Sequence, residues 1–183
     1  MKHSDVTVRV MAADEFAEMR TVSMAAFDGD PSIGALLDGL RGSWAWHDEL
    51  CFVAVRGDEI VGQVLYSSAI VDAPDRLVSV LLLSPVGILP ALQRTGIGSR
   101  LITESLTALE QRTEPLVFLE GSPSYYPRYG FRPGTELGFT APSVRIPPKA
   151  FMVRPLPGYE PSVSGALVYP DIFWRCDAVG LRP

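Results

Sequence analysis

Hydrophobic and polar residues alternate with two different periods in the first part of the chain. Residues 6–10, Val-Thr-Val-Arg-Val, follow a period of two, which predicts a β-strand. Asp14 is placed to cap a helix that extends to about Phe27, and Asp30-Pro31-Ser32 opens a second helix that ends between Gly39 and Gly42. The residues of the first helix predicted to face the core are Phe16, Met19, Val22, Met24, Ala26 and Phe27.

The middle of the chain is dominated by β-strand patterns. Residues 51–55 and 60–67 are predicted strands, and the turn sequence Arg56-Gly57-Asp58-Glu59 between them predicts an antiparallel hairpin. Residues 76–89 are almost continuously apolar, which predicts a strand covered on both faces. Breaks at Ser84-Pro85 and at Gly87 indicate a β-bulge in this strand.

Helical spacing returns after two glycines. Residues 99–112 place leucine and isoleucine at intervals of three and four, which predicts an amphipathic helix. Residues 115–120 then predict a short buried strand, so that strand, glycine turn, helix and strand form a crossover between parallel strands. Two further strands are predicted at 151–154 and 165–169.

Composition narrows the class of protein. With 183 residues, of which 47% are hydrophobic, the chain is expected to form a single domain, residues 1–183, with a substantial core. A net charge of -5 and the lack of a basic patch argue against nucleic acid as a partner. Polar residues follow Met1 and no stretch of ~18 apolar residues occurs, so neither secretion nor a membrane span is expected. Two distant cysteines, Cys51 and Cys176, favour a reducing cytoplasm over a disulfide or metal framework.

The glycine turn is the first candidate for binding chemistry. Gly96 and Gly98 allow the backbone to approach a ligand closely, while the helix that follows offers unpaired N–H groups and the positive end of its dipole. Such a turn binds anions well. The same glycines are equally compatible with a turn that only connects strand to helix, so more context is needed.

Three phosphate-binding patterns can be compared with this turn. A nucleoside-triphosphate loop requires a Gly-Lys dipeptide, and the chain contains none. The dinucleotide pattern requires a third glycine where Leu101 stands. The third pattern is Q/R-x-x-G-x-G/A, and Gln93-Arg94-Thr95-Gly96-Ile97-Gly98 resembles this motif of the GNAT N-acetyltransferases.

A second motif strengthens the resemblance. Tyr126 to Phe131 resembles the Y-x-x-x-G-F element that follows the next strand in the same superfamily, and residues 118–131 are similar to the YhbS-type predicted acetyltransferases. The resemblance implies the α/β GNAT acyl-CoA N-acyltransferase fold, a mixed central sheet with a splayed parallel strand pair flanked by helices. It also implies acetyl-CoA as co-substrate, an amine as acceptor, no metal, and a possible homodimer.

Site residues follow from the same resemblance. Backbone amides of the motif would bind the pyrophosphate and residues of the preceding strand would contact the pantetheine arm, a set comprising Val86, Gly87, Ile88, Gln93, Arg94, Thr95, Gly96, Ile97, Gly98 and Ser99. An amide at a strand bulge, Ile88 or Leu89, is a candidate donor to the thioester oxygen.

Two side chains are candidates for proton transfer. Tyr126 is the candidate general acid, because a phenol with a pKa near ~10 stays protonated at neutral pH. Packing is the alternative role for this residue, and Tyr125 is an alternative acid because Pro127 can distort the local helix. Glu120 ends the buried strand and is the candidate general base, with a strand-end salt bridge as the alternative.

Other residues give weaker indications. His3 and His47 are isolated in sequence from both motifs and indicate no metal site. Trp44, Trp46 and residues 151–174 are candidates for lining an acceptor pocket, with core packing as the alternative. The main rival to an enzyme is a non-catalytic acyl-CoA-binding module, which would keep the glycine turn without needing Tyr126.

Overall fold

The computed structural model describes residues 6–180. Contacts divide the chain into two compact units. The first unit comprises residues up to 67 together with 84–108, and the second comprises 68–83 together with residues from 109 onward. The expectation of a single domain stays a prediction.

The first unit contains a sheet with the strand order β1-β2-β3-β4. Strand β1 (Val6–Val10) pairs antiparallel with β2 (Cys51–Arg56), which pairs antiparallel with β3 (Glu59–Asp72). The predicted hairpin is therefore confirmed, although β3 extends beyond the predicted end at Ser67. Strand β4 (Leu77–Ile88) passes without interruption through the Ser84-Pro85 and Gly87 positions, and the Ser84-Pro85 peptide is cis.

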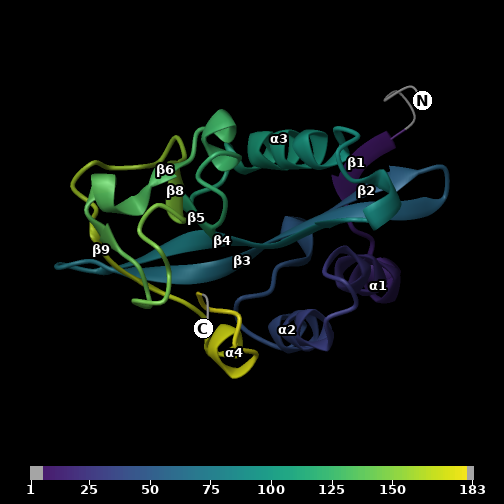
Figure 1. Cartoon of the computed structure of the whole chain (residues 1–183). Helices are drawn as coiled ribbons and strands as arrows, with labels where there is room; N and C mark the ends of the chain where they lie inside the picture. Colours follow the sequence, from purple (N-terminus) through teal and green to yellow (C-terminus); the bar gives the residue numbers. More distant parts are fainter. Residues whose placement is uncertain (1–5, 181–183) are drawn as a thin grey trace. The chain divides into compact units, whose positions relative to one another are not determined.

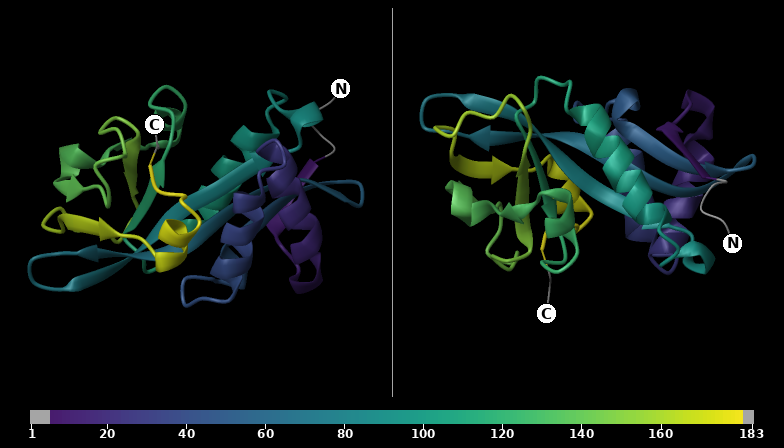
Figure 2. Two further views of the ribbon diagram at one scale, coloured as in Figure 1. Left: turned by 60° about the horizontal axis from the view of Figure 1, so that its bottom comes forward. Right: turned by 90° about the horizontal axis from the view of Figure 1, so that it is seen from above.

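Helices cover both faces of this sheet. Helices α1 (Phe16–Ala26) and α2 (Pro31–Arg41) lie side by side on one face, and α3 (Ile97–Leu109) lies on the other (Figures 1 and 2). The buried hydroxyl groups of Tyr66 on β3 and Ser105 on α3 are 2.8 Å apart and hydrogen-bonded. Asp30 caps α2 as predicted, since its carboxylate accepts a hydrogen bond from the Ser32 amide at 2.8 Å.

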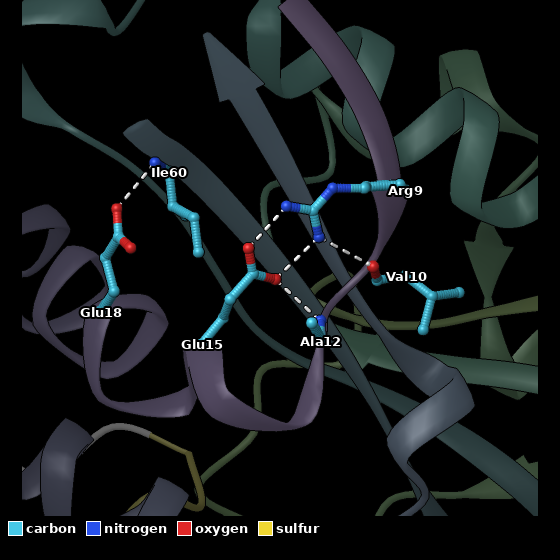
Figure 3. Close-up of polar contacts among 6 residues, drawn as sticks. All are labelled: Arg9, Val10, Ala12, Glu15, Glu18 and Ile60. Carbon is cyan, nitrogen blue, oxygen red and sulfur yellow. Dashed lines mark hydrogen bonds and ion pairs between the residues drawn. The ribbon is translucent and has the colours of Figure 1, made fainter. Parts of the chain in front are cut away.

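The start of α1 differs from the prediction. Asp14 does not cap the helix, because a 3-10 turn, η2 (Ala13–Glu15), precedes α1 and no side chain caps either element. The carboxylate of Glu15 instead accepts hydrogen bonds from the Ala12 amide and from both Nη atoms of Arg9 (Figure 3). Phe27 was predicted to face the core but is 40% exposed, because the chain turns away after Ala26.

The second unit contains the parallel strand pair. Its part of β4 pairs in parallel with β5 (Leu116–Glu120) through Leu81↔Val117 and Leu82↔Phe118, which confirms the predicted crossover. On the other edge, β5 pairs antiparallel with β8 (Phe151–Pro155), which also pairs with β6 (Arg132–Pro133). The sheet is therefore mixed, and the predicted α/β class is confirmed.

The remaining elements of the second unit are short. Strand β9 (Gly165–Val168) pairs antiparallel with β3 and parallel with β7 (Phe139–Thr140), and α4 (Asp171–Arg175) follows. The strand at 165–169 was predicted, whereas β6, β7 and α4 were not. Three buried rings, Phe118, Phe139 and Phe151, pack together with centroid separations of 5.1 and 5.7 Å from Phe118.

The helices and the two cysteines can be compared with what the composition predicts. Within residues 6–180, none of the helices is both long enough and apolar enough to cross a membrane. Cys51 and Cys176 are both free thiols, so the chain forms no disulfide between them.

Candidate functional site

The glycine turn lies in the first unit, between β4 and α3. Arg94 and Gly96 both have positive φ values, 62° and 92°, so the backbone enters the left-handed region twice before α3 begins at Ile97. Gln93, Arg94 and Gly96 are exposed, and only Ile97 of the motif is buried. The turn is therefore open to solvent rather than covered by packing. Gly98 lies inside the first turn of α3 and its φ is not positive, so its role is not to make the bend.

Side chains of the motif hold the turn in shape. Gln93 Nε2 donates to the Ile88 carbonyl at 3.2 Å, and Thr95 Oγ1 donates to the Leu92 carbonyl at 2.6 Å. The first amides of α3 have no acceptor within the helix, and its first turn contains no acidic residue. An exposed helix start of this kind fits an anionic group such as a diphosphate.

The end of β4 also belongs to the first unit. Val86 and Ile88 are partly exposed while Gly87 between them is buried against α1, where a Cβ would lie 2.8 Å from the Cβ of Ala26. The Leu89 amide donates to the Val61 carbonyl at 3.0 Å, so it is not available as an oxyanion donor. Since successive N–H groups of a strand point to opposite edges, the Ile88 amide points away from β3.

Tyr126 lies in the second unit, at the start of the 3-10 helix η5 (Tyr126–Tyr129). Its ring packs edge-on against Tyr125 and Phe131, with centroid separations of 5.2 and 5.8 Å. Burial, followed by the neighbouring phenols Tyr125 and Tyr129, raises the pKa of Tyr126 to about 12. The side chain is therefore protonated at neutral pH.

The structure distinguishes Tyr126 from its neighbour. The Tyr129 hydroxyl donates to the Tyr125 hydroxyl at 3.0 Å, and Arg128 lies over the Tyr125 ring. The Tyr126 hydroxyl has no hydrogen-bond partner among residues 6–180. The Tyr125 hydroxyl is therefore held as an acceptor within the aromatic cluster, whereas Tyr126 contributes its ring to that cluster.

Glu120, at the end of β5, is hydrogen-bonded to a residue far away in the sequence. Its Oε2 atom accepts a hydrogen bond from the Gly180 amide at 2.9 Å, and its Oε1 atom is buried. Burial raises the pKa of Glu120, while the Gly180 amide, the Tyr169 hydroxyl and Arg145 oppose that rise. The contact to Gly180 joins residues 60 positions apart, so no local sequence signal could have revealed it.

The predicted site residues fall into two groups. Those expected to bind cofactor lie together in the first unit, while Tyr126 and Glu120 lie in the second. Trp46 packs against Phe16 and donates to Asp48, whereas Trp44 is 57% exposed. His3 lies outside the described residues. No group of side chains suited to hold a metal ion occurs within the described part of the chain.

Comparison with known proteins identifies the class. Residues 7–134 match the family model of the acetyltransferase (GNAT) domain. This match spans more than half of the chain, so the chain belongs to the GNAT acetyltransferase family and the resemblance inferred from its motifs is confirmed.

Individual relatives agree with this family. The uncharacterized N-acetyltransferase YjhQ of Escherichia coli K12 is 27% identical over 137 residues, which cover 74% of this chain and 75% of YjhQ. A GNAT acetyltransferase from Brucella melitensis, crystallised with acetyl-CoA, is 26% identical with a TM-score of 0.73, and the match covers 93% of this chain and 99% of the other. YhbS of Escherichia coli, crystallised with CoA, shares the fold at a TM-score of 0.82 and 20% identity, covering 96% of this chain and 95% of YhbS.

Proposed function

We propose that this protein transfers an acetyl group from acetyl-CoA to a primary amine of a small molecule or peptide, by direct attack of the amine on the thioester. The observation that carries the proposal is the turn at residues 93–99, which is exposed at Gln93, Arg94 and Gly96. The turn leads into α3, whose first turn has no acidic side chain, and the chain belongs to the GNAT family. The Brucella melitensis relative, crystallised with acetyl-CoA, supports the choice of acyl donor.

The first unit supplies the groups that would hold acetyl-CoA. Amides of the turn from Thr95 to Ser99 bind the pyrophosphate, aided by the dipole of α3 and by the exposed Arg94. The partly exposed residues Val86 and Ile88 contact the pantetheine arm. When bound, acetyl-CoA supplies the activated acyl group, and the Ile88 amide donates a hydrogen bond to the thioester oxygen.

The second unit supplies the groups that would move protons. Tyr126 donates its phenolic proton to the departing sulfur, and its raised pKa keeps that proton in place until transfer. Glu120 accepts a proton from the attacking amine. Burial raises the pKa of this carboxyl above its ordinary range, which makes it a stronger base than an exposed glutamate.

Cofactor binding is tested by titration calorimetry with acetyl-CoA. We expect Gly98→Glu to abolish the binding heat, because the substitution puts bulk and negative charge among the first-turn amides of α3. Gly158→Glu is the matched control, since it adds the same charge at a position where the nearest atom to a Cβ is 3.7 Å away. A wild-type protein that releases no heat with acetyl-CoA would refute the proposed donor.

Proton transfer is tested by steady-state kinetics, with thiol release from acetyl-CoA measured against a panel of primary amines. We expect Tyr126→Phe to lower kcat by about 100-fold with little change in acetyl-CoA affinity, while Tyr125→Phe stays within a few-fold of wild type. Glu120→Gln should remove the rise of kcat/KM with increasing pH that follows deprotonation of Glu120. Acetyl-CoA binding without turnover of any amine would favour a non-catalytic acyl-CoA-binding module instead.

The proposal also includes a cytoplasmic location and a homodimer. Two free cysteines and the absence of a disulfide between them suit the reducing conditions of the cytoplasm. Whether two copies associate is tested by light scattering at several protein concentrations, where a constant monomer mass would refute the expected homodimer.

A further inference from the structure

Gly121 lies against one edge of the Tyr126 ring, next to the ring atoms Cδ2 and Cε2. The residue follows the last residue of β5, and a Cβ at this position would lie 2.6 Å from Cδ2 of the Tyr126 ring and closer still to Cε2. It would also lie 3.0 Å from Cδ1 of Leu119. Even alanine therefore has no room at position 121 unless the tyrosine ring moves.

The backbone of Gly121 is held in place by its neighbours. Its amide donates to the Ala150 carbonyl at 2.9 Å, which continues the pairing of β5 with β8 one residue past Glu120↔Phe151. The φ of Gly121 is not in the left-handed region, so a side chain here causes a steric conflict without backbone strain. The conflict therefore falls on the ring rather than on the strand.

The ring of Tyr126 has little freedom to move on its other sides. Phe131, which is 2% exposed, packs edge-on at 5.8 Å, and Tyr125 packs edge-on at 5.2 Å. The Tyr126 amide donates to the Ser122 carbonyl at 3.3 Å, which ties the start of η5 to the segment after Gly121. A ring displaced from Gly121 loses part of these contacts, and we therefore expect it to become more exposed.

We infer that Gly121 is a positioning residue for Tyr126: its missing side chain seats the phenol ring on the end of β5 and fixes where the hydroxyl points. The inference rests on the acid role proposed for Tyr126. Any residue could adopt the backbone conformation of Gly121, so a glycine is not needed there to form a turn. The role inferred for Gly121 is instead to leave room for the tyrosine ring.

Spectrophotometric titration of the tyrosines tests the seating without any acceptor substrate. In the wild-type background, Tyr126→Phe should leave the number of phenols ionised by about pH 11 unchanged, because the buried Tyr126 titrates higher. In the Gly121→Ala background, the displaced ring is more exposed, and Tyr126→Phe should then remove one ionising phenol. Gly158→Ala is the control, since its Cβ meets only the Thr113 carbonyl at 3.7 Å.

Stability provides a second measurement in case Gly121→Ala folds poorly. Removing the ring removes the conflict, so Gly121→Ala/Tyr126→Ala should be less destabilised than the sum of the two single changes. Additive destabilisation, or a Gly121→Ala protein that titrates like Gly158→Ala, would overturn the inference.

Turnover separates this inference from the proposed function. With an amine that the wild type acetylates, Gly121→Ala should lower kcat at least about tenfold with acetyl-CoA affinity unchanged. The double variant Gly121→Ala/Tyr126→Phe should lose no more activity than Tyr126→Phe alone. If Tyr126→Phe alone keeps full activity, the acid role fails, while the titration and the stability cycle still decide whether Gly121 seats the ring.

Discussion

Glu15 is the carboxylate whose surroundings most clearly favour its charged form. Both Nη atoms of Arg9 contact it, at 2.7 and 2.5 Å, and the Ala12 amide donates to it at 2.7 Å. The Arg9 guanidinium and then the Ala12 amide lower the pKa of Glu15 from 4.5 to about 2. This group joins β1 to the turn before α1, as Figure 3 shows.

The lowered pKa has a defined effect on stability. Because the folded pKa lies below the unfolded one, the stabilisation is fully present above about pH 4.5 and is lost as the pH falls toward about 2. The pair is partly exposed, so we expect Glu15→Gln to cost only about 1 kcal/mol at neutral pH and progressively less below about pH 4.5. Urea unfolding across this pH range measures the difference.

A control separates this pair from surface ion pairs in general. Glu59 lies 3.9 Å from Arg56 and its side chain is 62% exposed. Glu59→Gln should change the free energy of unfolding by less than about 0.5 kcal/mol at any of these pH values. A Glu15→Gln cost that does not depend on pH would show that the pairing is not the cause.

Residue roles were predictable from the sequence only where the chemistry is local. The exposed turn with Gly96 at positive φ could be predicted from its motif. The carboxylate of Glu120, in contrast, is bound by the amide of Gly180, and the ring of Tyr126 rests on Gly121 because of how η5 folds back. Such contacts depend on tertiary packing, which residue type and spacing do not encode directly.

The start of a helix could be predicted from the sequence where no distant residue changed the local hydrogen bonds. Asp30 followed by Pro31 predicts the start of α2, and the Asp30 carboxylate binds the Ser32 amide there. Asp14 offered a similar signal for α1, but a 3-10 turn precedes that helix, and the Glu15 carboxylate there binds Arg9 and the Ala12 amide. The competing partner, Arg9, lies on a separate strand, so helix-start rules alone could not predict the outcome.

The buried hydrogen bond between β3 and α3 tests how these elements are joined. Tyr66 and Ser105 are fully buried, and the Ser105 hydroxyl also donates to the Ile102 carbonyl at 3.1 Å. Tyr66→Phe keeps the ring and leaves Ser105 with that second partner, so we expect a loss of about 1 kcal/mol in chemical denaturation. Tyr159→Phe, which removes a hydroxyl from a half-buried tyrosine, should cost less than about 0.5 kcal/mol. Equal costs would show that the hydrogen bond between Tyr66 and Ser105 adds nothing measurable to stability.

Two long strands are divided between the two units, which affects how the protein unfolds. Strands β3 and β4 each run through both units, with their divisions after Ser67 and after Leu83. Each unit therefore contains only part of β3 and part of β4. When one half of a shared strand unfolds, the other half loses the anchor that holds it in place. The two units should therefore lose their structure together.

We therefore expect a single cooperative transition for the whole chain. Trp44 and Trp46 lie in the first unit and Trp174 in the second, so Trp174→Phe gives a protein whose fluorescence reports the first unit only. The double variant Trp44→Phe/Trp46→Phe reports the second. In each variant the fluorescence midpoint in urea should coincide with the midpoint of circular dichroism measured on the same protein, which removes any effect of the substitution on stability. Midpoints that separate in either variant would show that the units unfold independently, and the single domain expected from the sequence would then be wrong.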